Sequence, residues 1–158
     1  MTGPRVGEGA PAPLFERLVD DKPLVSTEAR PFRTVSPDQL RDSVRAELQR
    51  LLNTRCPQEQ EALVARKRTI LDYGVPDFTH LSPTSLADRK LVSRILGEAI
   101  ANYEPRLRNV SVRVVGYDGP RQRCEAVIDG LLVVGNVTEP VSFPTIINRS
   151  GVVEVGGA

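Results

Sequence analysis

The hydrophobic spacing of this chain changes at Glu104-Pro105-Arg106, and this change restricts the fold more than any other sequence feature. Apolar residues recur at helical spacing from about 85 to 103, whereas residues 107–115 alternate between apolar and polar side chains. Proline lacks an amide donor and disfavours helical backbone in the residue before it, so we expect a helix to end at Tyr103 or Glu104. The chain should therefore divide into a helical part and a strand part at this point.

The carboxylate of Glu104 is expected to need a cation, because the carbonyl groups at a helix C-terminus already carry partial negative charge. Arg106, Arg108 or a charge on another protein can supply that cation. Local physics favours a helix end with a surface ion pair. The other interpretation is a partner contact, since Glu104 and Arg106 lie two residues apart on an extended segment and can face the same way.

The composition indicates an ordinary globular domain without a nucleic-acid or sugar surface. The 158 residues are 40% hydrophobic and 26% charged, which suits one domain. With 21 basic and 20 acidic residues the net charge is +1, which gives no field to attract nucleic acid or an acidic membrane. Aromatic residues make up only 4% and tryptophan is absent, so no stacking platform for bases or sugars is expected.

No export signal or membrane span is expected, since the N-terminus lacks a basic-then-apolar pattern and no apolar run is long enough. We therefore expect a cytoplasmic protein whose two cysteines, Cys56 and Cys124, are free thiols, buried or half-buried. Residues 1–13 are predicted to be a flexible N-terminal tail and residues 14–158 a single domain. Two helical turns are predicted at 14–19.

Two main helices are predicted in the first part of the domain. In Ser36-Pro37-Asp38-Gln39, the serine can cap a helix, the proline fits its first position and the glutamine can complete a capping box. This helix should run to about residue 53 or 54. Residues 58–71 permit either a short helix or the start of a strand, and residues 73–77 should be a loop. The second main helix is predicted to open at 82–85.

The second part of the chain predicts a sheet of antiparallel strands. Strands are expected at 107–115, 121–134 and 141–147, with a short fourth near 152–155. Asp129-Gly130 permits a turn, but the alternation continues through it, so we predict one long strand with a bulge at Gly130. Pro144 places the third strand at a sheet edge. The predicted fold class is α+β, with two main helices packed on an antiparallel sheet of three to four strands.

No catalytic, cofactor or metal site is predicted. No pair of acidic residues is singled out by its spacing, and neither a glycine-rich phosphate loop nor a metal-ligand pattern occurs. His80, the single histidine, is expected to be a solvated loop residue. The basic cluster Arg66-Lys67-Arg68 is expected on a solvated face, with partner contact as the alternative. The sequence thus indicates a protein that binds other proteins.

Five motifs in fixed order resemble those of one family, and together they span about residues 14–155. They are similar to the TssE baseplate subunits of bacterial type VI secretion systems, a family related to the baseplate wedge proteins of contractile-tail phages and long labelled "lysozyme-like". One triplet alone is weak evidence, whereas five ordered matches are specific. The motifs are Leu-Phe-Glu-Arg-Leu at 14–18, Leu-Leu-Asn-Thr-Arg at 51–55, Ile-Leu-Asp-Tyr-Gly-Val-Pro-Asp at 70–77, Tyr-Glu-Pro-Arg-Leu at 103–107, and Glu-Pro-Val-Ser-Phe at 139–143 with Thr145.

The resemblance implies a structural protein rather than an enzyme, located in the baseplate at the cytoplasmic face of the inner membrane. The implied partners are the wedge subunits TssF, TssG and TssK, the TssB–TssC sheath, and the VgrG spike with the base of the Hcp tube. Neither nucleic-acid binding nor membrane insertion is implied. The sheath would dock by strand exchange on an edge strand with unpaired backbone groups. The predicted partner-binding residues are Glu104, Pro105, Arg106, Val141 and Phe143.

The motif at the helix end carries a prediction of its own. We expect Glu104→Ala and Arg106→Ala to leave the monomer folded and to abolish wedge binding, at about 2–5 kcal/mol if assembly desolvates the pair. The alternative function, suggested by the family's label, is a peptidoglycan hydrolase with Glu104 among its carboxylates. The lack of an identifiable carboxylate pair, of tryptophan and of an export signal weighs against that alternative.

Overall fold

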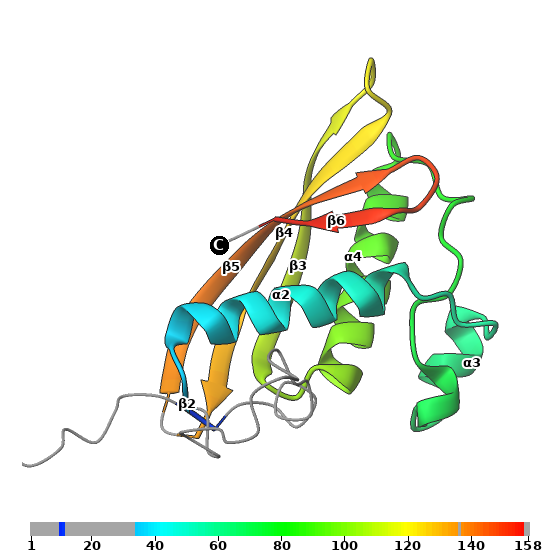
Figure 1. Cartoon of the computed structure of the whole chain (residues 1–158). Helices are drawn as coiled ribbons and strands as arrows, with labels where there is room; N and C mark the ends of the chain where they lie inside the picture. Colours follow the sequence, from blue (N-terminus) through cyan, green and yellow to red (C-terminus); the bar gives the residue numbers. More distant parts are fainter. Residues whose placement is uncertain (1–9, 12–33, 136, 157–158) are drawn as a thin grey trace, which may run out of the picture.

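The computed structural model of the chain describes residues 10–11, 34–135 and 137–156 (Figure 1). At the start of these residues, the two-residue strand β1 (Ala10–Pro11) pairs antiparallel with β2 (Thr34–Val35). β1 thus belongs to the segment that the sequence assigned to a tail. The helical turns expected at 14–19 lie outside the described residues.

The first main helix, α2 (Pro37–Asn53), has the capping box that the sequence predicts. The backbone amide of Gln39 donates to Ser36 Oγ at 3.3 Å, and the backbone amide of Ser36 donates to Gln39 Oε1 at 3.0 Å. These two bonds satisfy amides that a helix N-terminus otherwise leaves unpaired. The residues at helical spacing form its buried face: Leu40, Val44, Leu48, Leu51 and Leu52.

The segment between the two main helices, for which the sequence left helix and strand open, is a short helix followed by a turn. The helix is α3 (Gln60–Val64) and the 3-10 turn is η1 (Ile70–Asp72). The basic cluster at 66–68 is solvated at Arg66 and Lys67, as expected. The expectation is wrong for Arg68, whose side chain is only 3% exposed and pairs with Glu98 at 3.3 Å. Arg68 folds back onto the second main helix because a carboxylate of that helix is within reach.

Asp72 holds the η1 turn together. Its carboxylate accepts hydrogen bonds from Arg66 Nη1 and Nη2 at 2.9 and 2.6 Å, and from the amide and hydroxyl of Thr69 at 2.8 and 3.0 Å. The side chains of Ile70 and Leu71 remain at the surface, each 86% exposed. The turn therefore presents two apolar side chains on a backbone that a buried, fully bonded carboxylate fixes.

The second main helix, α4 (Leu86–Tyr103), begins and ends where the sequence predicts. Ser85 caps its N-terminus by accepting from the Asp88 amide at 3.2 Å. Glu104 is its C-terminal cap, so Pro105 lies just outside the helix. The buried face of α4 consists of Ile95, Leu96, Ala99 and Ile100.

The strand part forms one antiparallel sheet in the order β3-β4-β5-β6, which confirms the predicted α+β fold and its short fourth strand. β5 starts earlier and ends later than predicted because its pairing with β4 continues through both ends. The strands are β3 (Leu107–Asp118), β4 (Arg123–Val134), β5 (Val137–Asn148) and β6 (Val153–Val155).

β4 passes through Asp129-Gly130 without a turn, as predicted, but the bulge expected there lies in the neighbouring strand. The register between β3 and β4 shifts between Arg108 and Ser111 of β3, and Asn109 within this shift has a φ of +52°. A Cβ added at Gly130 would lie 3.3 Å from the carbonyl oxygen of Arg108. Glycine in β4 thus lets the bulged β3 backbone approach closely.

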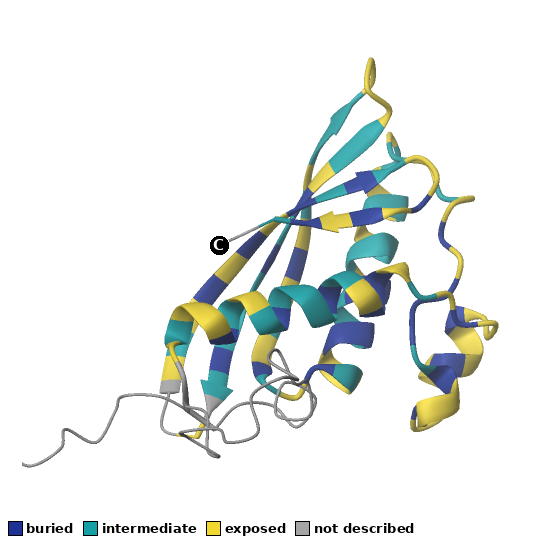
Figure 2. Ribbon diagram, viewed as in Figure 1, coloured by how far each residue is buried: buried dark blue, intermediate teal, exposed yellow. Residues whose placement is uncertain are grey.

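The hydrophobic core lies between one face of the sheet and the helices α2 and α4 (Figures 1 and 2). α4 contacts β3, and α2 crosses the sheet to contact β5 and β6. The other sheet face is polar and exposed at Ser111, Arg113 and Ser142, as expected for a sheet covered on one side. The inward strand residues are Leu107, Val112, Ala126, Ile128, Leu132, Val141, Phe143 and Ile147.

Gly74→Ala should destabilise the fold by about 2 kcal/mol or more, since backbone strain of this kind contributes about 1–3 kcal/mol and a steric clash adds to it. Gly74 has a φ of +112°, and a Cβ there would lie 2.5 Å from the Thr54 carbonyl oxygen. Urea unfolding followed by circular dichroism measures the effect. Gly119→Ala is the matched control because its Cβ would meet no atom closer than 3.8 Å. Equal stability of the two variants would contradict the close approach at Gly74.

Asp72→Asn should lower the free energy of unfolding at neutral pH. It should also make that free energy fall less steeply as the pH is lowered. The hydrogen bond from Arg66, followed by that from the Thr69 amide, lowers the pKa of Asp72 from 3.8 to about 2. Because the folded-state pKa is the lower one, ionised Asp72 stabilises the fold above about pH 4, and this stabilisation is lost as the pH falls towards 2. Urea titrations at several pH values between 7 and 2 measure the profile, with the exposed Asp42→Asn as control. An unchanged slope in Asp72→Asn would contradict the role of this carboxylate.

Candidate functional site

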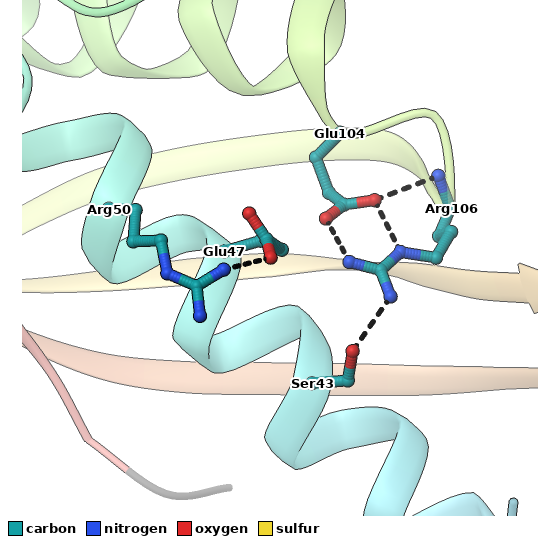
Figure 3. A network of polar contacts seen from close by, with 5 residues as sticks. All are labelled: Ser43, Glu47, Arg50, Glu104 and Arg106. Carbon is teal, nitrogen blue, oxygen red and sulfur yellow. Dashed lines mark hydrogen bonds and ion pairs between the residues drawn. The ribbon is translucent and has the colours of Figure 1, made fainter. Parts of the chain in front are cut away.

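Glu104 and Arg106 form a bidentate ion pair at the junction between α4 and β3 (Figure 3). Arg106 Nε donates to Glu104 Oε1 at 2.8 Å and Arg106 Nη2 donates to Oε2 at 2.6 Å. The backbone amide of Arg106 also donates to Oε1 at 3.2 Å. The Glu104 side chain is 4% exposed and that of Arg106 18%. Parallel charge-assisted hydrogen bonds of this kind fix both side chains in one geometry.

Hydrogen bonds of Glu104 and Arg106 connect two further elements, α2 and β4, to the end of α4. Arg106 Nη1 donates to Ser43 Oγ of α2 at 3.0 Å (Figure 3). The Glu104 amide donates to the Ile100 carbonyl of α4 at 2.8 Å, and the Arg106 carbonyl accepts from the Val133 amide of β4 at 2.8 Å. The ion pair therefore lies where α4 ends and β3 begins, with α2 and β4 bonded to it.

Among the cations that the sequence offered to Glu104, the structure selects Arg106, whereas Arg108 is exposed. Glu104 is buried and Arg106 half-buried, so the expectation of a surface ion pair is wrong on that point. α2 and β4 cover it, which only the tertiary packing could decide. Glu47 and Arg50 of α2 form a second, more exposed ion pair in the same region (Figure 3).

The burial of this pair changes what its removal should do. A buried carboxylate that loses its counter-ion typically destabilises a fold by about 3–5 kcal/mol. Arg106→Ala is therefore no longer expected to leave the monomer unaffected. Both oxygens of Glu104 also accept hydrogen bonds from Arg106, as in a structural ion pair.

The other predicted partner-binding residues lie in different surroundings. Pro105 is exposed beside the pair, whereas Val141 and Phe143 of β5 point into the core and are 6% and 1% exposed. The structure thus brings Glu104, Pro105 and Arg106 together at one junction. A partner would reach Val141 and Phe143 through the backbone of β5 or through its exposed neighbours.

One edge of β5 is paired along only part of its length. β4 pairs with β5 from Val137 to Asn148, whereas β6 pairs only with Thr145–Ile147. Within the described part of the chain, no strand covers residues 137–143 on the side away from β4. The prediction that Pro144 marks an edge strand is wrong, because β5 lies between β4 and β6 in the sheet. Only residues 137–143 of β5 lack a strand on that side in the described sheet, and β6 covers the residues beyond Pro144. We call residues 137–143 the open edge of β5.

Alternate residues of β5 direct their backbone groups towards the open edge. The Pro144 carbonyl accepts from the Gly156 amide at 2.7 Å on the side away from β4. Since N–H and C=O groups alternate sides along a strand, those of Thr138 and Ser142 point the same way. The backbone of Pro140 also faces away from β4. Neither Pro140 nor Pro144 therefore removes an N–H that would bond to β4.

The exposed sheet face carries a row of polar contacts that the sequence did not reveal. Arg113 Nη2 of β3 donates to Asp129 Oδ2 of β4 at 2.7 Å, and Ser142 Oγ of β5 donates to Asp129 Oδ1 at 2.7 Å. These two hydrogen bonds, that from Arg113 first, lower the pKa of Asp129. The alternation in the sequence indicated that these polar residues share one face of the sheet. Which of them contact one another depends on the register between strands, which the sequence did not give.

The described residues contain no group of three or more His, Cys, Asp or Glu side chains that could hold a metal ion. Cys56 is buried and Cys124 half-buried, and both are free thiols as predicted. His80 is exposed, also as predicted. In the part of the chain that the structure describes, no helix is long and apolar enough to cross a membrane.

Comparisons with known proteins agree on the architecture. A chain of a solved structure, "The baseplate complex from the type VI secretion system", is similar with a TM-score of 0.50 and 21% sequence identity, over 68% of this chain and 93% of that chain. At this identity the likeness concerns the fold alone. A comparison with curated proteins gives no match. The family model "Baseplate wedge protein gp25" matches residues 38–136, from α2 to the end of β4. Because this match covers more than half of the sequence, the chain belongs to the gp25 family of baseplate wedge proteins.

Proposed function

We propose that the chain is a structural component of a type VI secretion baseplate, where it joins the wedge of TssF, TssG and TssK and docks the TssB–TssC sheath. The observation that carries this proposal is the open edge of β5 in a member of a baseplate wedge family. In this proposal the open edge faces the sheath, and the junction at Glu104-Pro105-Arg106 faces the wedge.

Docking at the open edge is supported by the chemistry of its backbone. Unpaired N–H and C=O groups allow a strand of another protein to extend the sheet. Thr138 and Ser142 each offer both groups, whereas Pro140 between them offers a carbonyl only. A docking strand must match this sparse donor pattern, which restricts its register. The exposed side chains of the edge then supply further selectivity.

Ser142→Pro should weaken sheath docking about tenfold or more, because it removes an amide donor from the open edge and breaks no bond to β4. Ser142→Ala is the matched control, since it keeps the amide and loses only the hydroxyl bond to Asp129. Cosedimentation of each purified variant with assembled TssB–TssC sheath measures docking, and thermal melting verifies the fold. Equal cosedimentation of the proline variant and the parent would contradict docking at this edge.

Wedge binding at the junction is supported by its fixed geometry. Pro105 is exposed between two side chains that hydrogen bonds hold in place, and the Arg106 side chain is 18% exposed. A preorganised surface of this kind loses little side-chain freedom on binding. The same pair stabilises the monomer, so alanine variants mix the loss of a contact with the loss of the fold. An informative variant must separate the two effects.

Arg106→Ala should lower the free energy of unfolding by about 3–5 kcal/mol, because it leaves Glu104 buried without a counter-ion. The double variant Glu104→Leu/Arg106→Met should recover much of this stability, since well-packed apolar residues can replace a buried pair. Urea unfolding measures both values. If the double variant were no more stable than Arg106→Ala, the unpaired charge would not be the cause of the loss.

The folded double variant then tests the wedge contact itself. We expect it not to bind the purified TssF–TssG pair, as measured by co-elution in size-exclusion chromatography. Arg108→Ala removes an exposed arginine two residues further along and should keep binding. Full binding by the double variant would exclude the charges of the junction as the wedge contact.

A further inference from the structure

A cavity of about 430 Å³ lies beside the end of β5 that β6 covers. Its walls come from the loop 78–84, from α4, from the ends of β3, β4 and β5, and from the turn after β5. We call it the Arg89 pocket. Neither Glu104 nor Arg106 lines it, so it is separate from the junction. Its volume falls within the range of protein sites that bind small ligands or side chains.

Among the described residues, the charged side chains that line the Arg89 pocket are both positive. They are Arg89 and Arg149, and no described aspartate or glutamate lines it. Neither arginine has a carboxylate partner among the described residues. Arg89 Nη2 reaches the Thr84 carbonyl at 3.5 Å while its Nε is buried without an acceptor, and Arg149 Nη1 donates to Gln122 Oε1 at 2.9 Å. Two guanidinium groups thus retain donors that a negatively charged ligand can satisfy.

The remaining wall of the pocket combines apolar and polar side chains and comes from both layers of the fold. Apolar side chains beside two cations suit a ligand that carries an apolar group and a carboxylate close together. The apolar lining residues that matter to this argument are Leu81, Val92, Val114, Tyr117, Cys124 and Ile147.

A free inorganic anion fits this site less well than a peptide does. Phosphate would use the cations and leave the apolar wall uncovered. The N-terminus of α4 does not supply an anion site, because Ser85 caps it and the Asp88 carboxylate accepts from the Ser82 amide at 2.9 Å. An acidic peptide with an apolar side chain would use both the cations and the apolar wall.

We propose that the Arg89 pocket binds an acidic peptide segment of a partner protein, with an apolar side chain between α4 and the sheet and a carboxylate paired with Arg89. This inference does not depend on the proposed baseplate role, since it rests on the pocket alone. The peptide is defined by its chemistry, an apolar residue flanked by acidic ones.

Cys124 offers a direct measure of occupancy. It lines the pocket and is half-buried, whereas Cys56 does not line it and is 4% exposed. Burial raises the pKa of the Cys124 thiol, so alkylation is compared at one fixed alkaline pH. A bound peptide should shield Cys124 from N-ethylmaleimide, and mass spectrometry distinguishes it from Cys56, the internal control.

The probe is the peptide acetyl-Asp-Leu-Phe-Glu-amide, titrated to about 5 mM at constant ionic strength. We expect it to slow alkylation of Cys124 about threefold or more at saturation, because the bound fraction is protected. Acetyl-Lys-Leu-Phe-Lys-amide and inorganic phosphate, at the same concentrations, should protect much less. Protection by the acidic peptide alone supports the proposal.

A charge exchange tests whether the arginine carries the recognition. Arg89→Glu should weaken binding of the acidic peptide about tenfold or more and should favour the lysine peptide instead. Lys90→Glu is the matched control, because it makes the same charge change one residue away on an exposed position outside the pocket. Arg149→Glu, at an exposed position, provides a second variant if Arg89→Glu fails to fold. Rates with and without peptide are compared within each variant.

Several outcomes would contradict binding of an acidic peptide in the Arg89 pocket. No protection of Cys124 by the acidic peptide, or equal protection by both peptides, would overturn the proposal. Equal protection by phosphate would indicate a general anion site and would contradict a peptide site. Unchanged acidic-peptide binding in folded Arg89→Glu and Arg149→Glu variants would exclude the two arginines.

Discussion

The buried ion pair between Glu104 and Arg106 determines how the helical part of this chain meets its sheet. A carboxylate at a helix C-terminus is unfavourable unless a cation lies close by. The proline between the two residues stops the helix and extends the backbone, so the arginine two positions later returns to the carboxylate in a bidentate contact. Ser43 of α2 accepts from the same guanidinium. Three neighbouring residues thus end a helix, begin a strand and hold a second helix.

The position of the open edge of β5 follows from this junction through a short series of contacts. The Arg106 carbonyl accepts from the Val133 amide, which fixes β4 against the start of β3. β4 in turn pairs with β5 along its whole length. The two surfaces proposed for assembly therefore belong to one continuous hydrogen-bonded body. A substitution that unfolds the junction would also disturb the packing of the open edge. Variants that test either surface must therefore keep the junction folded.

The sequence predicted those features that depend on neighbouring residues. The cap at Ser36, the start of the second main helix at 82–85, the helix end before Pro105 and the change of hydrophobic period are local, and the structure has each of them. What escaped prediction depends on tertiary contacts. The burial of Arg68, the location of the bulge in β3 and the row from Arg113 across the sheet each require knowledge of which elements pack together. The Arg89 pocket could not be predicted for the same reason, because its walls come from segments that are distant in the sequence.

The two prolines of β5 explain how a sheet can keep an open edge without pairing indiscriminately. Both Pro140 and Pro144 lie in the phase whose N–H would point away from β4, so the internal ladder is intact. The same placement removes donors from the edge, and a long edge with all its donors is prone to association with any extended chain. A strand that docks here must match the remaining groups of Thr138 and Ser142. Pro140, the proline within the open edge, thus restricts what can extend it, whereas the Pro144 carbonyl is already bonded to the Gly156 amide.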